Sequence, residues 1–343
     1  MKKLLSFLKY ALLLGISAFL MWYALKELDF QKMWAELRNT NYSWIGLSLF
    51  MGVAAYMSRA YRWHMQIKPT GHNPSLVRTY RAMMVGYLAN LVLPRMGEVV
   101  RCSVLKRSDG VPVNTGFGTV IAERFIDLLM LLLAIGLTLL VEFNRIRDFF
   151  LGLFTEKYSG FEQTLNSLYW VFWVMLGAFV VILFIMLRHL SRLRKNRYFR
   201  KTVDFVKGML QGVFSITRLD NQFAFWGHTI FVWLMYYAMS VVVFFAMPAT
   251  SDLGWGAGLS VLVIGSLGMA APVQGGIGVY HLLVQATLLL YGVPKEAGMA
   301  YALLAHTSQT LLVVVMGVIS FIATVLHRPQ QIITQESVHE LKQ

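Results

Sequence analysis

The chain has little cysteine and little charge. Its 343 residues include one cysteine, Cys102, so no disulfide can form within the chain. Charged residues make up 14% of the sequence, against about 25% in an average soluble domain. Hydrophobic residues make up 57%, and several runs are long enough to cross a bilayer, which takes about 18 or more mostly apolar residues. These features exclude an ordinary soluble fold and predict an all-α protein that crosses a membrane several times.

The sequence also lacks the motifs of common catalytic and metal sites. It contains no His-x-x-x-His pair, no cysteine cluster for zinc, no Walker loop and no arrangement that suggests a Ser-His-Asp triad. The longest polar stretch, 188–221, is too short for a soluble domain and is rich in basic residues. We therefore expect one membrane domain over 1–343, with 188–221 as a basic cytoplasmic loop and with neither cofactor nor metal.

The apolar runs divide into complete and interrupted segments. The first begins close to the N-terminus, and we expect an uncleaved span because it is long for a signal peptide and lacks a convincing cleavage site. Two segments, 81–94 and 257–291, are broken by proline or glycine. The six predicted complete spans are 8–25, 44–61, 117–141, 168–187, 226–247 and 298–326.

Loop charge predicts the orientation of these spans. Basic residues dominate 59–81, 95–107 and 188–218, whereas 248–256 has none. By the positive-inside rule the basic segments are cytoplasmic, which puts both termini inside the plasma (inner) membrane. The net charge of +14 then reflects these loops and anionic lipid headgroups, and nucleic acid is not an expected partner.

The two interrupted segments share one pattern. Residues 86–101 and 265–281 both run Gly-x-Leu, an apolar stretch, then Pro-x-x-Gly. Matching interruptions in two halves of a chain indicate the binding site of a transporter. We expect 81–94 to form a re-entrant hairpin from the cytoplasm and 257–291 to form one from outside, turning at 272–278. The half-repeats 44–141 and 226–326 would then be inverted copies, although two full crossings in 257–291, giving eight spans, or two unrelated breaks also fit.

Ionisable residues inside an apolar span mark the first candidate site. Glu123 and Asp127 are four residues apart, on one face of a helix, and Arg124 can pair with Asp127. Such groups are costly in a membrane and indicate function, unless they form a structural ion pair near the headgroups. We predict that Arg124 pairs with Asp127 or Glu123 inside the protein.

Further candidates flank the two breaks. Gly275, Gly276 and Gly278 would expose backbone amides at a helix start, where phosphate binds, or would form a tight packed turn. Glu98 and Arg101 follow the first break and would hold a headgroup at the cytoplasmic mouth. Arg59 and Arg62 end the second span, where snorkelling to lipid phosphate is the simpler interpretation. The pairs His281/Gln285 and His306/Gln309 are more often structural than ligand-binding.

Together these residues resemble the lysylphosphatidylglycerol synthase transmembrane region family, a flippase-like module also found beside some archaeal glycosyltransferases. The resemblance covers roughly 12–326 and implies a polytopic fold with re-entrant hairpins that moves lipids between leaflets. Large members append a soluble aminoacyl-transfer domain, and because none is visible here we do not expect lysyl-lipid synthesis. Members commonly carry an acid where this chain has His281, which argues against a cationic lysyl headgroup. The motifs that carry the resemblance are Arg59/Arg62, Asn90 with 94–98 and Arg101, Glu123-Arg124 with Asp127, and 272–278.

The sequence thus predicts a lipid translocase that works without ATP hydrolysis. Its substrate and partner would be a phospholipid or isoprenoid-linked lipid with a phosphate headgroup, and a second copy or a membrane enzyme is a further candidate partner. The alternatives are a lipid transferase with Glu123 or Glu98 as general base, and a scaffold that docks through 188–218. The predicted substrate-binding residues are Arg59, Arg62, Asn90, Glu98, Arg101, Glu123, Arg124, Asp127, Gln274, Gly275, Gly276, Gly278 and His281.

Overall fold

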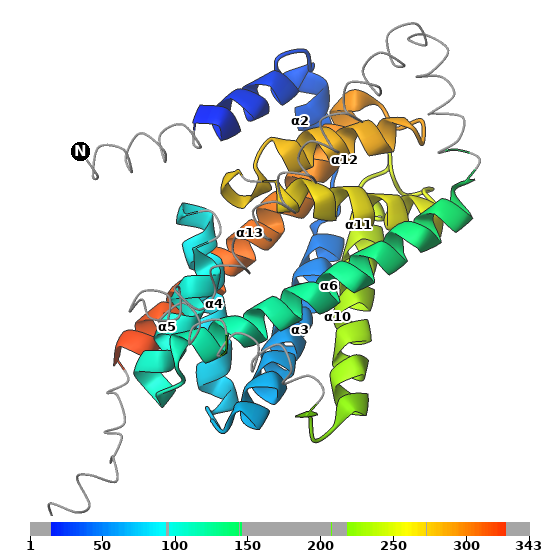
Figure 1. Cartoon of the computed structure of the whole chain (residues 1–343). Coiled ribbons are helices and arrows are strands. Elements are labelled where there is room, and N and C mark those ends of the chain that lie inside the picture. The colour runs from blue at the N-terminus through cyan, green and yellow to red at the C-terminus, as the bar shows by residue number, and fades with distance from the viewer. Residues whose placement is uncertain are drawn as a thin grey trace, which may run out of the picture. The chain divides into compact units, whose positions relative to one another are not determined.

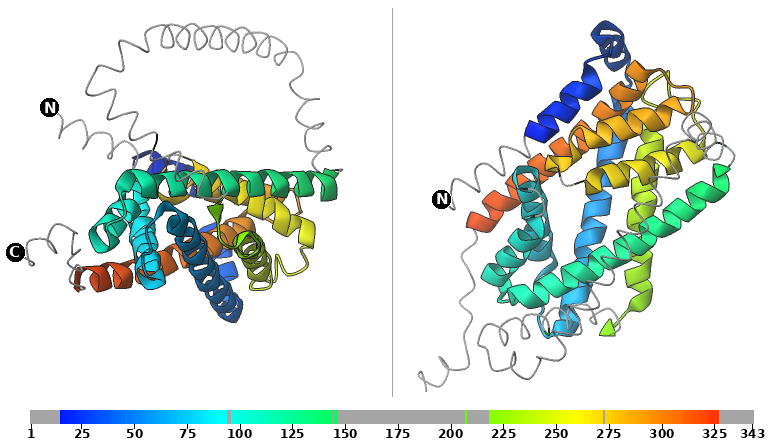
Figure 2. Two further views of the ribbon diagram at one scale, coloured as in Figure 1. Left: turned by 60° about the horizontal axis from the view of Figure 1, so that its bottom comes forward. Right: turned by 45° about the horizontal axis from the view of Figure 1, so that its top comes forward.

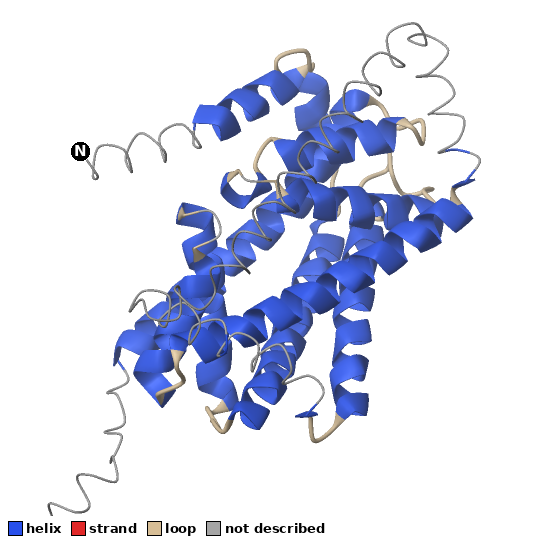
Figure 3. Cartoon of the chain, viewed as in Figure 1, coloured by secondary structure: helices blue, strands red, loops and turns tan. Residues whose placement is uncertain are grey.

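Helices make up all regular structure in the described residues, as Figure 3 shows. The computed structural model describes residues 15–93, 96–143, 145, 207, 218–271 and 273–326. The chain forms two units, and the fold and site below belong to the unit Met1–Thr138 with Met209–Gln343. The elements are a helix Gly15–Leu25, α2 (Phe30–Arg38), α3 (Tyr42–Ile67), η1 (Lys68–Thr70), α4 (Leu76–Val92), α5 (Gly97–Asp109), α6 (Val113–Val141), α10 (Gln222–Phe244), α11 (Trp255–Ala270), η3 (Gln274–Gly276), α12 (Val279–Leu289) and α13 (Lys295–Leu326).

Three of the described helices, α6, α10 and α13, are long and apolar enough to cross a membrane. The predicted spans 117–141, 226–247 and 298–326 fall on them. The span 44–61 lies in α3, which has 26 residues but places Arg59, Arg62 and His64 in its last turns, so composition does not mark it as a span. The predicted span 168–187 lies outside the described residues, as does most of 188–221.

The first interrupted segment is not a hairpin by itself. Helix α4 continues without a break from Leu76 to Val92, and Gly97 begins α5, so these two helices are the arms. They approach closely, because a Cβ atom on Gly86 would lie 2.7 Å from the carbonyl oxygen of Gly97. The segment 95–107, predicted as a cytoplasmic loop, is therefore mostly packed helix. Its basic residues suggested a loop, yet Arg101 is buried against partners from other helices.

The second interrupted segment is a helix, a turn and a helix. Helices α11 and α12 pack against each other, and the turn between them contains η3 and glycines with positive φ (Figure 1). At a rise of about 1.5 Å per residue the arms are about 24 and 17 Å long, shorter than the roughly 30 Å hydrocarbon core of a bilayer.

The two breaks meet in space. The side-chain Nε2 of Gln274, in η3, donates to the carbonyl oxygen of Val92 at the end of α4 over 3.2 Å. Around this contact α10 packs along α3, and α13 packs along α4 and α12, as the views in Figure 2 agree. One apolar core gathers around Phe244, Met247 and Tyr301, and a second gathers around Trp63 with residues of α4 and α5. The helices of each half of the chain thus have their own core.

Candidate functional site

Two acids of α6 and three arginines form a buried ion cluster, comprising Arg59, Arg62, Arg101, Glu123 and Asp127. Arg59 donates to Glu123, and also to Asp127 over 2.9 Å. Arg62 donates to Asp127 over 2.7 Å and to Glu123 over 3.3 Å. From α5, the guanidinium of Arg101 lies 3.0 Å from Glu123 and 4.7 Å from the centre of the Trp63 ring. The cluster holds three cations and two anions, so its formal charge is +1.

Helical spacing assembles this cluster. Arg59 and Arg62 are three residues apart on α3, and Glu123 and Asp127 are four apart on α6, so each pair shares one helix face. Glu123 is 0% exposed, and a buried charge is tolerated only when it is paired. The snorkelling interpretation of Arg59 and Arg62 is therefore wrong, because both side chains are buried in the protein.

Arg124 has a different place from the one predicted. Its side chain is 45% exposed and bonds Glu98 of α5 over 3.2 Å, whereas its contact with Asp127 spans 3.9 Å. The predicted buried pair of Arg124 with Asp127 or Glu123 is thus wrong in its main partner. The arginines of α3 neutralise these acids, which leaves the Arg124 guanidinium beside open space.

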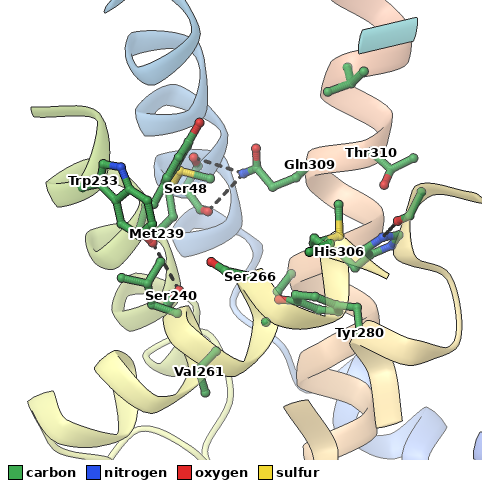
Figure 4. Close-up of a pocket in the computed structure, with 18 of the residues that line it drawn as sticks. Ser48, Trp233, Met239, Ser240, Val261, Ser266, Tyr280, His306, Gln309 and Thr310 are labelled. Atoms are coloured by element: carbon green, nitrogen blue, oxygen red, sulfur yellow. Dashed lines mark hydrogen bonds between the residues drawn. The ribbon is translucent and has the colours of Figure 1, made fainter. Parts of the chain in front are cut away.

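That open space is a cavity of about 600 Å³. Its walls come from α3, α6, α10, α11 and α13, with Leu91 of α4, Gly275 of η3 and Tyr280 of α12. Arg59, Arg124 and Asp127 form its charged part. The remaining lining is apolar apart from hydroxyl, amide, indole and imidazole groups, part of which Figure 4 shows. These neutral polar residues are Ser48, Tyr56, Trp233, Tyr236, Ser240, Ser266, Tyr280, His306, Gln309 and Thr310.

Two neutral histidine contacts hold the turn of the second break. Nε2 of His306 lies 2.7 Å from the carbonyl oxygen of Gly275, and Nδ1 of His281 accepts from the amide of Gly278 over 3.4 Å. The two imidazole rings are 4.8 Å apart. A Cβ atom on Gly276 would lie 2.7 Å from Sδ of Met269, and one on Gly278 would lie 2.6 Å from Leu20. Of the glycine cluster predicted to bind phosphate, only Gly275 lines the cavity, and the others are packed.

A side chain closes the first break. Oδ1 of Asn90 accepts from the amide of Gly97 over 2.6 Å, which joins the end of α4 to the start of α5. With the bond from Gln274 to Val92, this contact makes Asn90 and Gln274 residues that position the two turns. Pro94 and Arg95 lie outside the described residues.

The predicted site residues therefore separate into four groups. On the cavity wall lie Arg59, Arg124, Asp127 and Gly275; beneath it lie Arg62, Arg101 and Glu123; beside Arg124 lies Glu98; and in the two turns lie Asn90, Gln274, Gly276, Gly278 and His281.

Sequence reasoning missed the cavity residues of α10. Trp233, Tyr236 and Ser240 recur at i, i+3 and i+7, so they form one polar stripe on an apolar span. On α13, His306, Gln309 and Thr310 do the same, and the first two had been considered structural. A polar stripe at helical spacing within a span is the signal that could have located both walls.

Comparison with known proteins places this site within a recognised region. The family model for the lysylphosphatidylglycerol synthase TM region matches residues 10–317, which contain the ion cluster and the whole cavity lining. The chain is 25% identical over 122 residues to a UPF0104 membrane protein of Methanocaldococcus jannaschii, covering 35% of this chain and 36% of that protein. It is 24% identical over 294 residues to Glycosyltransferase AglD of Haloferax volcanii, covering 79% of this chain and 47% of that protein. The chain thus spans less than half the length of either relative, and no solved structure matches it.

Proposed function

Because this chain belongs to the lysylphosphatidylglycerol synthase TM region family and is an integral membrane protein, we propose that it moves lipids between the two leaflets of the membrane. The substrate is a phospholipid or an isoprenoid-linked lipid whose headgroup carries phosphate. One observation carries this proposal above the others: a cavity with charged and polar groups in its wall lies among apolar helices.

The cavity suits a lipid headgroup in size and polarity. Ligand pockets commonly enclose about 300–1,000 Å³, and this one encloses about 600 Å³. A headgroup that crosses a bilayer needs polar partners in place of water, and the cavity supplies them while the acyl or isoprenoid tail stays in the hydrocarbon. The cationic excess of the ion cluster and the exposed guanidinium of Arg124 favour a phosphate.

The arrangement of the two breaks supports an alternating mechanism. We propose that α4/α5 and α11/α12 are re-entrant hairpins that enter from opposite faces, as the loop charges indicate, with both termini cytoplasmic in the plasma membrane. Their tips meet through Gln274 and Val92. Movement of one hairpin relative to the other would then open the cavity to one leaflet at a time.

A lipid transferase is the second candidate, since the relative AglD is named a glycosyltransferase. It is less well supported because a general base must reach its substrate. Glu123 is 0% exposed and lies beneath the cavity wall, and Glu98 bonds Arg124. Neither carboxylate lines the cavity. A scaffold role through 188–218 concerns residues outside the described ranges.

Transport by purified protein in liposomes tests the proposal. Fluorescent phosphatidylglycerol is placed in both leaflets, the outer label is quenched chemically, and the loss of the inner label reports movement. We expect faster loss than in protein-free liposomes, and a rate several-fold lower with Arg124→Gln. Arg107→Gln, an exposed arginine of α5 outside the cavity, is the matched control. Rates equal to those of protein-free liposomes for every lipid tried would contradict the proposal, and a covalently altered lipid would favour the transferase.

A further inference from the structure

We infer that the headgroup accepted by the cavity is a phosphate ester joined to a neutral polyhydroxyl ring, as in a hexosyl phosphate or an inositol phosphate. This inference rests on the proposed function and names its substrate class. It follows from three properties of the cavity wall: its charge, its unused hydrogen-bonding groups and its volume.

The charged part of the wall favours an anion and offers nothing to an amine. The ionic groups of the wall are Arg59, Arg124 and Asp127, so its formal charge is +1. Asp127 is the one carboxylate among the described lining residues, and both of its oxygens accept from arginines, Oδ1 from Arg62 over 2.7 Å and Oδ2 from Arg59 over 2.9 Å. An ethanolamine or lysyl ammonium would therefore meet cations without a free acceptor, whereas a phosphate can approach the exposed guanidinium of Arg124.

The neutral part of the wall has donors and acceptors that remain unused. Nε1 of Trp233 and Oε1 of Gln309 are buried without a hydrogen-bond partner in the described structure. The hydroxyls of Ser266 and Thr310 line the same cavity, and no other described residue bonds them. Figure 4 shows that these four residues come from three different helices around the cavity. Unpaired buried polar groups are unfavourable, so a ligand that pairs with them gains affinity.

A sugar or inositol ring matches these groups. Each ring hydroxyl both donates and accepts, as the mixture of indole, amide and hydroxyl groups requires. The apolar face of the ring can pack on an aromatic side chain such as Trp233 or Tyr236. Tyr236 also accepts from Arg59 over 2.9 Å, so the aromatic surface lies directly beside the charged part of the wall. A phosphate and an attached ring would therefore occupy adjacent parts of one cavity.

The volume leaves room for the ring. About 600 Å³ equals the space of about twenty water molecules at about 30 Å³ each. A phosphate alone would fill a small part of it. A glycerol headgroup would fill more but could not reach the polar side chains of α10, α11 and α13 together.

Competition in the liposome assay tests the inference. Movement of fluorescent phosphatidylglycerol is measured with equal amounts of one unlabelled lipid: phosphatidylinositol, a polyprenyl phosphoryl hexose, phosphatidylethanolamine or a glycosyl diacylglycerol. We expect the first two to inhibit about tenfold more strongly than the last two, because a site that bonds hydroxyls and phosphate together rejects lipids lacking either. The stronger of the first two identifies a diacylglycerol or an isoprenoid tail.

Variants separate the two parts of the headgroup. Ser266→Ala with Thr310→Val should bring the inhibition by the ring-bearing phosphate lipids close to that by phosphatidylethanolamine. Ser308→Ala, which removes a hydroxyl of α13 outside the cavity lining, should leave the preference unchanged. Equal inhibition by all four lipids, or strongest inhibition by phosphatidylethanolamine, would overturn the inference while the transport proposal stands. Absence of any protein-dependent movement would instead overturn the transport proposal itself.

Discussion

The two helical breaks share a sequence pattern but differ in chemistry. The first, between α4 and α5, is closed by a side chain, since Asn90 accepts from the amide of Gly97. The second, between α11 and α12, is held by backbone conformation, with positive φ at Gly275, Gly276 and Gly278, and by two uncharged histidine contacts. The repeated Pro-x-x-Gly pattern therefore marks where the helices stop and leaves their chemical role to the neighbouring residues.

The surroundings of the two breaks differ in the same way. The first hairpin brings Arg101 to the buried acids of α6, so its side of the cavity is charged. The second brings Gly275 and Tyr280 beside His306, so its side is polar and neutral. One cavity between two similar breaks thus has two unlike parts, as recognition of an amphiphile with an ionic and a neutral portion requires.

Removal of an acid from the ion cluster should have the largest effect. Glu123→Ala leaves three arginines with one carboxylate in a buried site, and breaking such a buried pair costs about 3–5 kcal/mol. We expect a large drop in the unfolding temperature in detergent, or failure to obtain folded protein. Glu36→Gln, on α2 outside the cluster, is the control and should behave like the parent. An unchanged unfolding temperature in Glu123→Ala would show that the charged side of the comparison is wrong.

A side chain at the second break should come next. Gly276→Val must adopt a φ of 73°, which costs a non-glycine residue about 1–2 kcal/mol, and its Cβ would overlap Met269. We expect destabilisation together with loss of transport, both measured on the purified protein. Gly275→Asn is the matched variant, because asparagine tolerates positive φ and the nearest atom to its Cβ is 3.4 Å away. If Gly276→Val melts like the parent, the turn is not the rigid element described here.

Loss of the side-chain closure at the first break should have a moderate effect. Asn90→Ala removes the bond to the Gly97 amide, a loss of about 1 kcal/mol. Thermal unfolding of the variant measures it, and Asn39→Ala, an exposed asparagine after α2, is the control. A loss as large as that of Glu123→Ala would place Asn90 among the determinants of the core, contrary to the comparison.

Arg124→Gln should have the smallest effect on stability. Its partly exposed ion pairs contribute at most about 1 kcal/mol, so the variant should unfold close to the parent and to Arg107→Gln. The same change should lower transport several-fold, which separates a cavity residue from the buried cluster. A variant that is strongly destabilised would show that Arg124 belongs to the cluster after all.

The sequence located the candidate residues better than it paired them. The spacing of Glu123 and Asp127 predicted a shared helix face, and the glycines of 272–278 predicted the second turn. Local spacing favoured Arg124 as the partner, because it is three residues from Asp127. The partners in the structure are Arg59 and Arg62, more than sixty residues away along the chain, and such tertiary pairing between helices leaves no local signal.

Burial of basic residues was the second feature beyond reach of the sequence. Arg101 lies in a stretch rich in basic residues and was assigned to a loop, yet it packs on Trp63 and reaches Glu123. Composition cannot distinguish a cation that faces lipid headgroups from one that neutralises an acid on another helix. The polar stripes of α10 and α13 were overlooked because each residue is uncharged and is unremarkable alone.

The central claim is that the cavity holds the phosphate headgroup of a lipid at Arg124. Native mass spectrometry of protein purified in mild detergent tests it directly, because the mass of retained lipid identifies the headgroup. We predict a phosphate-bearing lipid on the parent and on Arg107→Gln, with retention several-fold lower on Arg124→Gln. Equal retention of the same lipid by all three proteins, or retention of lipids without phosphate, would contradict the claim.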